Sequence, residues 1–287
     1  MLRFNTLLRE AYLGEAGFDL ENVFLLRHED KRVKSGVYQA WKSEPKNLEA
    51  YQSNQKWKNR FPDGSMLAAF VVGPEGETLF VGMYDVLKLS RVNEEFNDPL
   101  LGKMPAGDRA SHELKHSDRM QDYEEKVVIE WGKGKLAWRQ RAQEKNNKFV
   151  LEIRAQPKEE PFPHYVNLLR RLEDLRSIYP SWQVRLKERK GVYLLTFDDG
   201  VQYVGSATGE EGFWQRWQNY LTTGHGGNRI LIRDQRDARN AMVSILEVSG
   251  SAQTERDIIN QEMLWQRKLG TRAKRLESAN DPAGPSE

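Results

Sequence analysis

The sequence of 287 residues carries 44 Lys and Arg against 42 Asp and Glu, so its formal net charge at pH 7 is only +2. Any surface for nucleic acid must therefore come from local clusters of basic side chains rather than from a bulk positive field. The chain contains no cysteine, which excludes disulfides, thiolate metal sites and cysteine nucleophiles.

The composition predicts a soluble, folded, cytoplasmic protein. The first residues lack the apolar stretch of a secretory signal, and no apolar run approaches the ~20 residues that span a bilayer, so we expect no membrane contact. The 8 Trp, 10 Tyr and 11 Phe are typical of a chain with a packed core. The length suits two domains of ordinary size.

Residues 1–155 predict a mixed, β-rich domain. Apolar side chains at helical spacing predict a first helix over residues 4–12. The expected strands are short apolar runs bounded by Gly, Pro and polar turns, at residues 23–26, 67–72, 78–86, 127–131, 136–142 and 149–153. Several strands with short turns favour a small, curled sheet. The polar stretch 91–119 interrupts them and predicts a long loop.

A proline-rich segment separates this domain from the rest of the chain. Prolines remove backbone donors and disfavour helix, so residues 156–163 predict a linker. The second domain then spans residues 164–287. It opens with an apolar stripe that predicts an amphipathic helix ending near Tyr179, formed by Tyr165, Leu168, Leu169, Leu172 and Leu175.

The most specific pattern in the chain is a hairpin followed by a helix. Gly191-Val192-Tyr193 and Tyr203-Val204-Gly205 lie in β-prone runs joined by an Asp-Asp-Gly turn, which is a strong hairpin signal. A helix is predicted from about 211 to 223, with its apolar residues at a spacing of four. Arg216 and Tyr220 lie one turn apart on a neighbouring face, so Arg216 can point back at the strand tyrosines.

Three further features follow this helix. A glycine-rich turn at residues 223–228 carries His225 and can bring backbone amides and an imidazole close to an anion. The last helix begins at a capping box over residues 254–257 and carries Glu262 among apolar side chains. Between them, a predicted helix presents a basic face formed by Arg229, Arg233 and Arg236.

This order of strand, strand, arginine-bearing helix and glutamate-bearing helix resembles the catalytic domain of the GIY-YIG nuclease family. The resemblance covers residues 182–280. This segment is similar to a bacterial subgroup of the family that has the Gly-His-Gly-Gly-Asn turn seen here at 224–228. It implies an α+β fold in which a small antiparallel sheet is flanked by helices, here preceded by the β-rich domain. The residues that it places in one catalytic site are Tyr193, Tyr203, Arg216, Tyr220, His225 and Glu262.

Two positions depart from the family pattern. Tyr220 stands where many family members have a histidine, whereas His225 matches a second, less constant family histidine. The family's C-terminal asparagine has no clear counterpart, because Glu277 lies near the expected position and Asn280 follows it.

The resemblance implies hydrolysis of DNA phosphodiester bonds with the help of one divalent metal ion. Glu262 would hold Mg²⁺ or Mn²⁺ together with water and substrate phosphate. Arg216 would stabilise the charge on the phosphate with its fork of donors, Tyr193 would act as general base, and Tyr203 would orient water or phosphate. The DNA backbone would be contacted by Arg229, Arg233 and Arg236.

Each of these residues also has a plain structural interpretation. A strand tyrosine is usually a packed residue with a satisfied hydroxyl, and a glutamate on an apolar helix face is as often a salt-bridge partner as a metal ligand. Arginines interleaved with aspartates usually form a solvated helix face. A histidine in a glycine turn is often only a turn residue.

The N-terminal domain is expected to position DNA and to restrict which DNA is cut. Aromatic side chains lie beside polar and charged residues around Trp41, Trp57 and Trp138, a combination that can grip nucleic acid or read a modified or flipped base. Core packing is the more general explanation for most of these aromatics. Restriction, repair and defence against foreign DNA would each suit such a nuclease. The sequence also fits two other functions, a nucleic-acid-binding protein with an inactive nuclease-like module and a protein-interaction scaffold.

Overall fold

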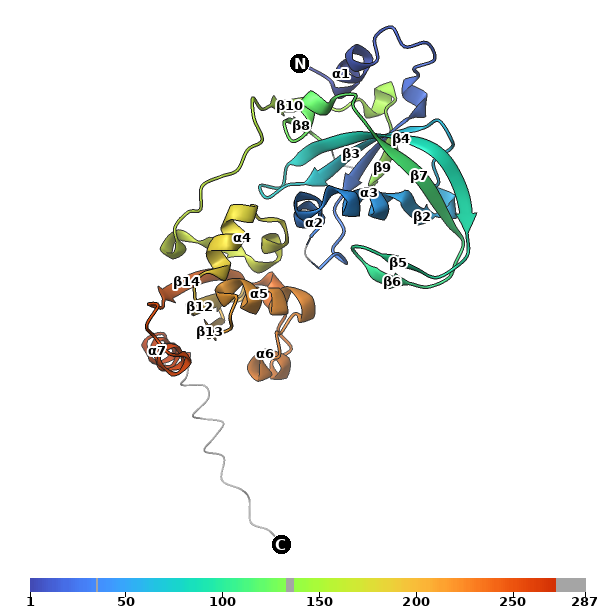
Figure 1. The fold of residues 1–287 in the computed structure, drawn as a ribbon. Coiled ribbons are helices and arrows are strands. Elements are labelled where there is room, and N and C mark those ends of the chain that lie inside the picture. Colours follow the sequence, from blue (N-terminus) through green and yellow to red (C-terminus); the bar gives the residue numbers. More distant parts are fainter. Residues whose placement is uncertain (35, 133–136, 272–287) are drawn as a thin grey trace. The chain divides into compact units, whose positions relative to one another are not determined.

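Figure 1 shows the computed structural model, which describes residues 1–34, 36–132 and 137–271. The described chain is mixed α+β, as predicted, and divides into two compact units. Unit 1 comprises Met1–Glu160 and Arg176–Tyr179, and unit 2 comprises Pro161–Leu175 and the residues from Pro180 onward. The division at Glu160 and Pro161 falls within the proline-rich segment 156–163. None of the described helices has both the length and the apolar composition that crossing a membrane requires.

Unit 1 is built on an eight-stranded mixed sheet. Its strands pair in the order β10-β8-β4-β3-β1-β9, while β7 pairs with β4 and β2 with β7. Only the β1 and β3 pair runs parallel among these pairings of the described residues. The strands are β1 Val23–His28, β2 Asn54–Lys56, β3 Met66–Val72, β4 Thr78–Val92, β7 Arg109–Ser117, β8 Val127–Ile129, β9 Arg139–Arg141 and β10 Val150–Ile153.

Both faces of the central strands β1 and β3 are buried, which explains why β1 is a continuous apolar run. On one face, Leu26 packs in a core with Trp41 of α2 (Val37–Ser43) and Leu48 of α3 (Pro45–Ser53). On the other face, Leu25 packs in a second core with Phe4 of α1 (Phe4–Ala11). The alternation of side chains along a strand therefore divides the apolar residues between two cores.

The stretch 91–119 is largely strand, so the prediction of a long loop is wrong. β4 runs on to Val92, β7 returns along it as a long curved pair, and a small hairpin of β5 (Phe96–Asp98) and β6 (Gly102–Met104) connects the two strands at the end of this pair (Figure 1). β7 buries Ala110, His112 and Ser117 and packs Leu114 against a core, while its remaining positions carry polar side chains. Its ladder hydrogen bonds hold the strand, and its polar composition conceals the alternation.

A further strand of unit 1 is shorter than predicted. The strand expected at 136–142 is observed as β9 over Arg139–Arg141, and residue 136 lies outside the described residues. Short 3₁₀ helices connect the elements of this unit, at Leu20–Asn22, Trp57–Asn59, Gln121–Tyr123 and Glu144–Asn146.

Unit 2 contains a four-stranded antiparallel sheet in the order β11-β14-β12-β13. The hairpin predicted from the sequence is β12 and β13, the arginine-bearing helix is α5, and the capping box begins α7 as expected. The strands are β11 Leu169–Arg171, β12 Gly191–Thr196, β13 Gln202–Ala207 and β14 Met242–Val248. The helices are α4 Pro180–Lys187, α5 Gly212–Thr223, α6 Arg229–Arg233 and α7 Glu255–Lys268, with a 3₁₀ turn at Ala238–Asn240.

The amphipathic helix predicted over 165–175 does not form. This segment is a 3₁₀ turn at Tyr165–Asn167, then β11, then a 3₁₀ helix at Leu172–Ser177. Leu169 is 61% exposed, so the apolar residues do not share one helical face. Pairing of β11 with β14 overrides the local pattern.

The basic helix is shorter than predicted. α6 ends at Arg233, and Gln235 has a positive φ of 50°, which interrupts the helix before Arg236. Glu277 and Asn280 lie outside the described residues.

Candidate active site

Tyr193, Tyr220 and Arg216 form one hydrogen-bonded cluster between the sheet and α5. In β12, Val192 belongs to the core formed with α7, so the adjacent Tyr193 faces the other way and meets the Trp217 ring of α5 edge-on at 6.2 Å. The Tyr193 and Tyr220 hydroxyls lie 2.8 Å apart, and both side chains are fully buried. Arg216 Nε donates to the Tyr193 hydroxyl at 3.1 Å, and its Nη2 donates to the Tyr220 hydroxyl at 3.2 Å.

The Arg216 guanidinium is held in a fixed orientation. Its Nη1 donates to the Gly226 carbonyl oxygen at 3.1 Å, so the fork has acceptors at all three nitrogens. An arginine has five N–H donors, and these bonds use three of them. The side chain is half-buried, so a rigid cation with spare donors lies at the edge of the tyrosine cluster.

Two glycines of the hairpin are required by steric contact. Gly205 lies opposite Tyr193 in the ladder, and a Cβ there would meet the Tyr193 hydroxyl oxygen at 2.4 Å. A Cβ at Gly191 would lie 2.1 Å from the Glu247 carbonyl oxygen of β14. Both distances are far shorter than any real carbon contact, so these positions allow the Tyr193 ring and the β14 backbone to approach.

Tyr203 joins the cluster through an asparagine. Tyr203 pairs with Leu195 in register, on the same face of the sheet as Tyr193, and is half-buried. Its hydroxyl accepts a hydrogen bond from Asn228 Nδ2, and the Asn228 side chain also acts to lower the pKa of the Tyr220 hydroxyl. Asn228 Oδ1 caps α6 by accepting from two backbone N–H groups. The sequence signal for Asn228 was its position before an apolar run, which is typical of an N-cap.

Glu262 reaches the hairpin from the α7 side. Its Oε2 accepts from the Ser206 hydroxyl, and its Oε1 accepts from Gln266 Nε2 at 2.8 Å. Ser206 is in register with Val192, so it points to the α7 face of β13, while Tyr203 points to the α5 face. β13 is the edge strand of the sheet, so side chains from its two faces can both reach the space beside this edge.

Ser206 and Gln266 were not predicted as site residues. Gln266 had a signal, because it lies one helical turn after Glu262. Ser206 had none, since its proximity to Glu262 depends on how α7 packs against β13.

Burial controls the protonation of the tyrosine cluster. Burial raises the pKa of Tyr193 well above its usual value, the neighbouring Tyr220 hydroxyl raises it further, and the Arg216 charge opposes the shift. Burial also raises the pKa of Tyr203, with a further contribution from the Glu262 carboxylate. At neutral pH the cluster therefore consists of neutral phenols around a charged guanidinium.

His225 and the three predicted DNA-contacting arginines lie outside this cluster. His225 Nδ1 accepts from the Gly227 backbone N–H at 3.0 Å, which is a turn-stabilising bond. Arg233 pairs with Asp234, and Arg236 pairs with Asp199, each at 2.7 Å. Arg229 is exposed.

A cavity of about 140 Å³ lies beside Tyr203. Its walls come from the hairpin, from α6 and the residues after it, and from the end of α7. Arg233, Arg236 and Gln266 all line it. Two of the predicted phosphate-contacting arginines therefore share a cavity with Tyr203 and with the hydrogen-bond partner of Glu262.

Glu262 is the candidate ligand for a divalent metal ion. The described residues contain no group of three or more His, Cys, Asp or Glu side chains arranged to hold a metal. A lone carboxylate suits Mg²⁺, which keeps several waters and is often completed by substrate phosphate.

Comparison with known proteins found no matching family model, no matching curated protein and no matching solved structure.

Proposed function

We propose that this chain is a divalent-metal-dependent DNA endonuclease of the GIY-YIG type. The observation that carries the proposal is the bonding of one half-buried arginine, Arg216, to the hydroxyls of Tyr193 and Tyr220. Tyr203 extends this arrangement to the edge strand that also bonds Glu262 through Ser206. A fixed cation, phenol hydroxyls beside it and a carboxylate bonded to the neighbouring strand are groups that phosphodiester hydrolysis can use.

Arg216 supplies the fixed positive charge. Its orientation is set before substrate binds, so no reorganisation is needed when negative charge grows on the phosphate. Its remaining N–H donors contact the phosphate oxygens. A lysine in this place has no planar fork and cannot bond Tyr193, Tyr220 and Gly226 together while also facing phosphate.

Tyr193 and Tyr203 have different roles because their surroundings differ. Tyr193 accepts the proton of the attacking water as a phenolate, a form that burial disfavours and Arg216 favours. Tyr203 is half-buried and lines the cavity, so its hydroxyl orients the water or a phosphate oxygen. Glu262 holds the Mg²⁺ or Mn²⁺ ion, which when bound supplies positive charge to the phosphate and favours ionisation of water.

Full burial of Tyr193 and Tyr220 favours a second candidate function. If this cluster serves only packing, the module binds nucleic acid without cutting it. Phosphate would then dock at the cavity lined by Arg233 and Arg236. In either case the partner is DNA, and a cytoplasmic role in restriction, repair or defence would suit it.

A cleavage assay separates these candidates. Plasmid, unmodified and modified duplexes and single strands are incubated with the protein in Mg²⁺, Mn²⁺ or EDTA, beside Glu262→Ala. The control is Glu188→Ala, which changes an exposed carboxylate of the same unit. We expect metal-dependent cutting that Glu262→Ala abolishes and Glu188→Ala retains.

Other outcomes of this assay would contradict the proposed catalytic mechanism. Cutting in EDTA, or equal cutting by Glu262→Ala, contradicts the role of Glu262. DNA binding without any cutting, weakened when Arg233 and Arg236 are replaced by Gln, supports the second candidate.

A further inference from the structure

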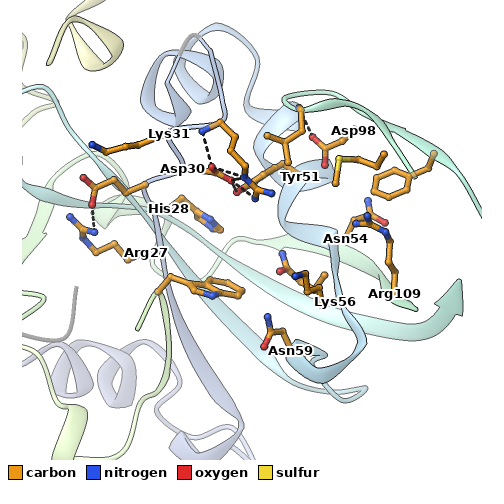
Figure 2. Close-up of a pocket in the computed structure, with 17 residues that line it drawn as sticks. Arg27, His28, Asp30, Lys31, Tyr51, Asn54, Lys56, Asn59, Asp98 and Arg109 are labelled. Carbon is orange, nitrogen blue, oxygen red and sulfur yellow. Dashed lines mark hydrogen bonds and ion pairs between the residues drawn. The ribbon is translucent and has the colours of Figure 1, made fainter. Parts of the chain in front are cut away.

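Unit 1 contains a cavity of about 570 Å³ that the cleavage chemistry does not use. It lies at the end of β1 and is closed by residues of α3, β2, the β5 and β6 hairpin and the start of β7. Figure 2 shows Arg27, His28 and Asp30 on one side of it, with Asn54, Lys56 and Arg109 opposite. Its volume lies within the range of sites for small molecules and cofactors.

Three aromatic side chains line the cavity. Trp138 is half-buried, and the His28 ring is tilted toward it with 6.5 Å between centroids. Tyr51 meets the same His28 ring edge-on at 5.8 Å, and Phe96 forms part of the opposite wall beneath Arg109. The cavity therefore offers flat π surfaces from more than one side.

Fixed polar groups accompany these rings. The Asp30 carboxylate accepts from the Tyr51 hydroxyl at 2.8 Å and from Arg32 Nη2 at 2.6 Å, so its position is set without a ligand. His28 is buried, and its Nε2 bonds Gln52 Oε1 at 3.2 Å. Fixed polar groups beside aromatic walls suit a planar heterocycle.

The lining is positively charged on balance. Five basic residues face three acidic residues around it, Arg27, Lys31, Arg32, Lys56 and Arg109 against Glu29, Asp30 and Asp98. Arg109 lies over the Phe96 ring at 5.1 Å, and its Nε is buried with no hydrogen-bond partner in the described chain. This unused donor and excess charge suit an anionic group attached to the heterocycle.

We propose that this cavity binds a nucleotide unit, with the base against Trp138 and Tyr51 and the phosphate toward Lys56 and Arg109. Such a unit has two sources, a free mononucleotide or a base everted from a DNA strand. The proposal concerns unit 1 alone and holds whether or not unit 2 cuts DNA.

The test measures binding by the full chain in EDTA, with Glu262→Ala as background so that no probe is cut. The probes are the four 5′-mononucleotides by calorimetry, and a labelled single strand, a matched duplex and a duplex with one mismatch by fluorescence anisotropy. We expect Trp138→Ala to weaken binding roughly 5- to 150-fold, because stacking on an aromatic side chain is worth roughly 1–3 kcal/mol per base. Arg109→Gln should weaken binding about tenfold or more, because a hydrogen bond to a charged group contributes roughly 1.5–3 kcal/mol. The Trp138 backbone stays anchored in the first variant, since its carbonyl accepts from the Arg27 N–H at 2.7 Å.

Matched controls keep the result specific. Trp57→Ala removes a half-buried tryptophan of unit 1 that does not line this cavity, and Arg9→Gln removes an exposed arginine paired with Glu144. Tighter binding of the mismatched duplex than of the matched one identifies an everted base, because unpairing then costs less. Mononucleotide binding without a mismatch effect identifies the free ligand.

The proposal is overturned if the parent protein binds none of these probes. It is also overturned if Arg109→Gln and a folded Trp138 variant, either Trp138→Ala or Trp138→Phe, bind as the parent does. Thermal unfolding of each variant shows whether it is folded.

Discussion

At the scale of single residues, the central feature of unit 2 is a charge surrounded by phenols. Burial alone would lower the pKa of Arg216, but the hydroxyls of Tyr193 and Tyr220 more than offset this and raise it. Arg216 therefore stays charged through any pH at which the protein is folded. In the same contacts, the neutral Tyr193 hydroxyl is a hydrogen-bond partner of Arg216 and Tyr220. Tyr193 can accept a proton only when its hydroxyl has ionised to the phenolate.

Removing one hydroxyl at a time separates structure from catalysis. Tyr193→Phe leaves Arg216 Nε without its acceptor and leaves the Tyr220 hydroxyl with only the bond from Arg216 Nη2, so we expect unit 2 to lose about 1–3 kcal/mol. Tyr203→Phe acts on a half-buried group and should cost less stability, yet it should still lower the cleavage rate. The measurements are denaturant unfolding and single-turnover cleavage.

Tyr165→Phe is the control for both variants, because Tyr165 is a half-buried tyrosine of the same unit whose hydroxyl donates to the Arg185 carbonyl oxygen of α4 at 2.8 Å. A Tyr203→Phe variant that cuts DNA as fast as the control would remove Tyr203 from the site.

The sequence predicted some site residues and not others for clear physical reasons. Tyr193, Arg216 and Tyr220 lie on one hairpin and the helix directly after it, so local periodicity was enough to bring them together. Asn228 and Ser206 contact the site only because distant segments pack against β13. Such contacts depend on tertiary structure and leave little trace in a single sequence.

At the scale of elements, the packing of the hairpin depends on glycines that have no Cβ atom. Gly205→Ala would place a methyl group 2.4 Å from the Tyr193 hydroxyl oxygen, so the ring must move away from Arg216. We expect unit 2 to lose about 1–3 kcal/mol, as in other overpacked cores, and cleavage to fall with it.

Gly250→Ala provides the matched change. A Cβ at Gly250 would meet only Gln253 Oε1, at 3.9 Å, and its backbone needs no positive φ. Equal stability of the two alanine variants in denaturant unfolding would show that the Gly205 contact is not close in solution.

The strands that the sequence predicted best were those with both faces buried. β1 and β3 are continuous apolar runs, whereas β7 uses polar side chains on its solvated positions and was mistaken for a loop. The prediction for the segment 165–175 was wrong in another way, because a helix was expected where a strand forms. Its leucines have helical spacing, but pairing with β14 converts its centre into a strand.

At the scale of the whole molecule, a buried histidine should make the stability of unit 1 depend on pH. Burial lowers the pKa of His28 in unit 1 to about 4, opposed by its Gln52 bond and the Asp30 charge. The unfolded chain takes up a proton near pH 6.5, so the stability from neutral His28 is complete above that pH. It is lost as the pH falls toward 4, by at most about 3 kcal/mol.

His28→Gln should therefore flatten the acid dependence of unit 1 unfolding between pH 6.5 and 4, measured by denaturant titration at several pH values. His164→Asn, in unit 2, is the control. An unchanged slope in His28→Gln would show that His28 is protonated in the folded protein.

The most direct test of one shared site is a double-mutant cycle on cleavage. Single-turnover rates on a duplex are measured in Mg²⁺ for the wild type, Arg216→Gln, Glu262→Gln and the double variant. If both side chains act on one phosphate, each single change should slow cleavage by roughly 10²-fold or more, and the double variant should be much faster than the product of the two losses predicts. Wild-type rates in either single variant, or two losses that simply multiply, would contradict a common active site at β13.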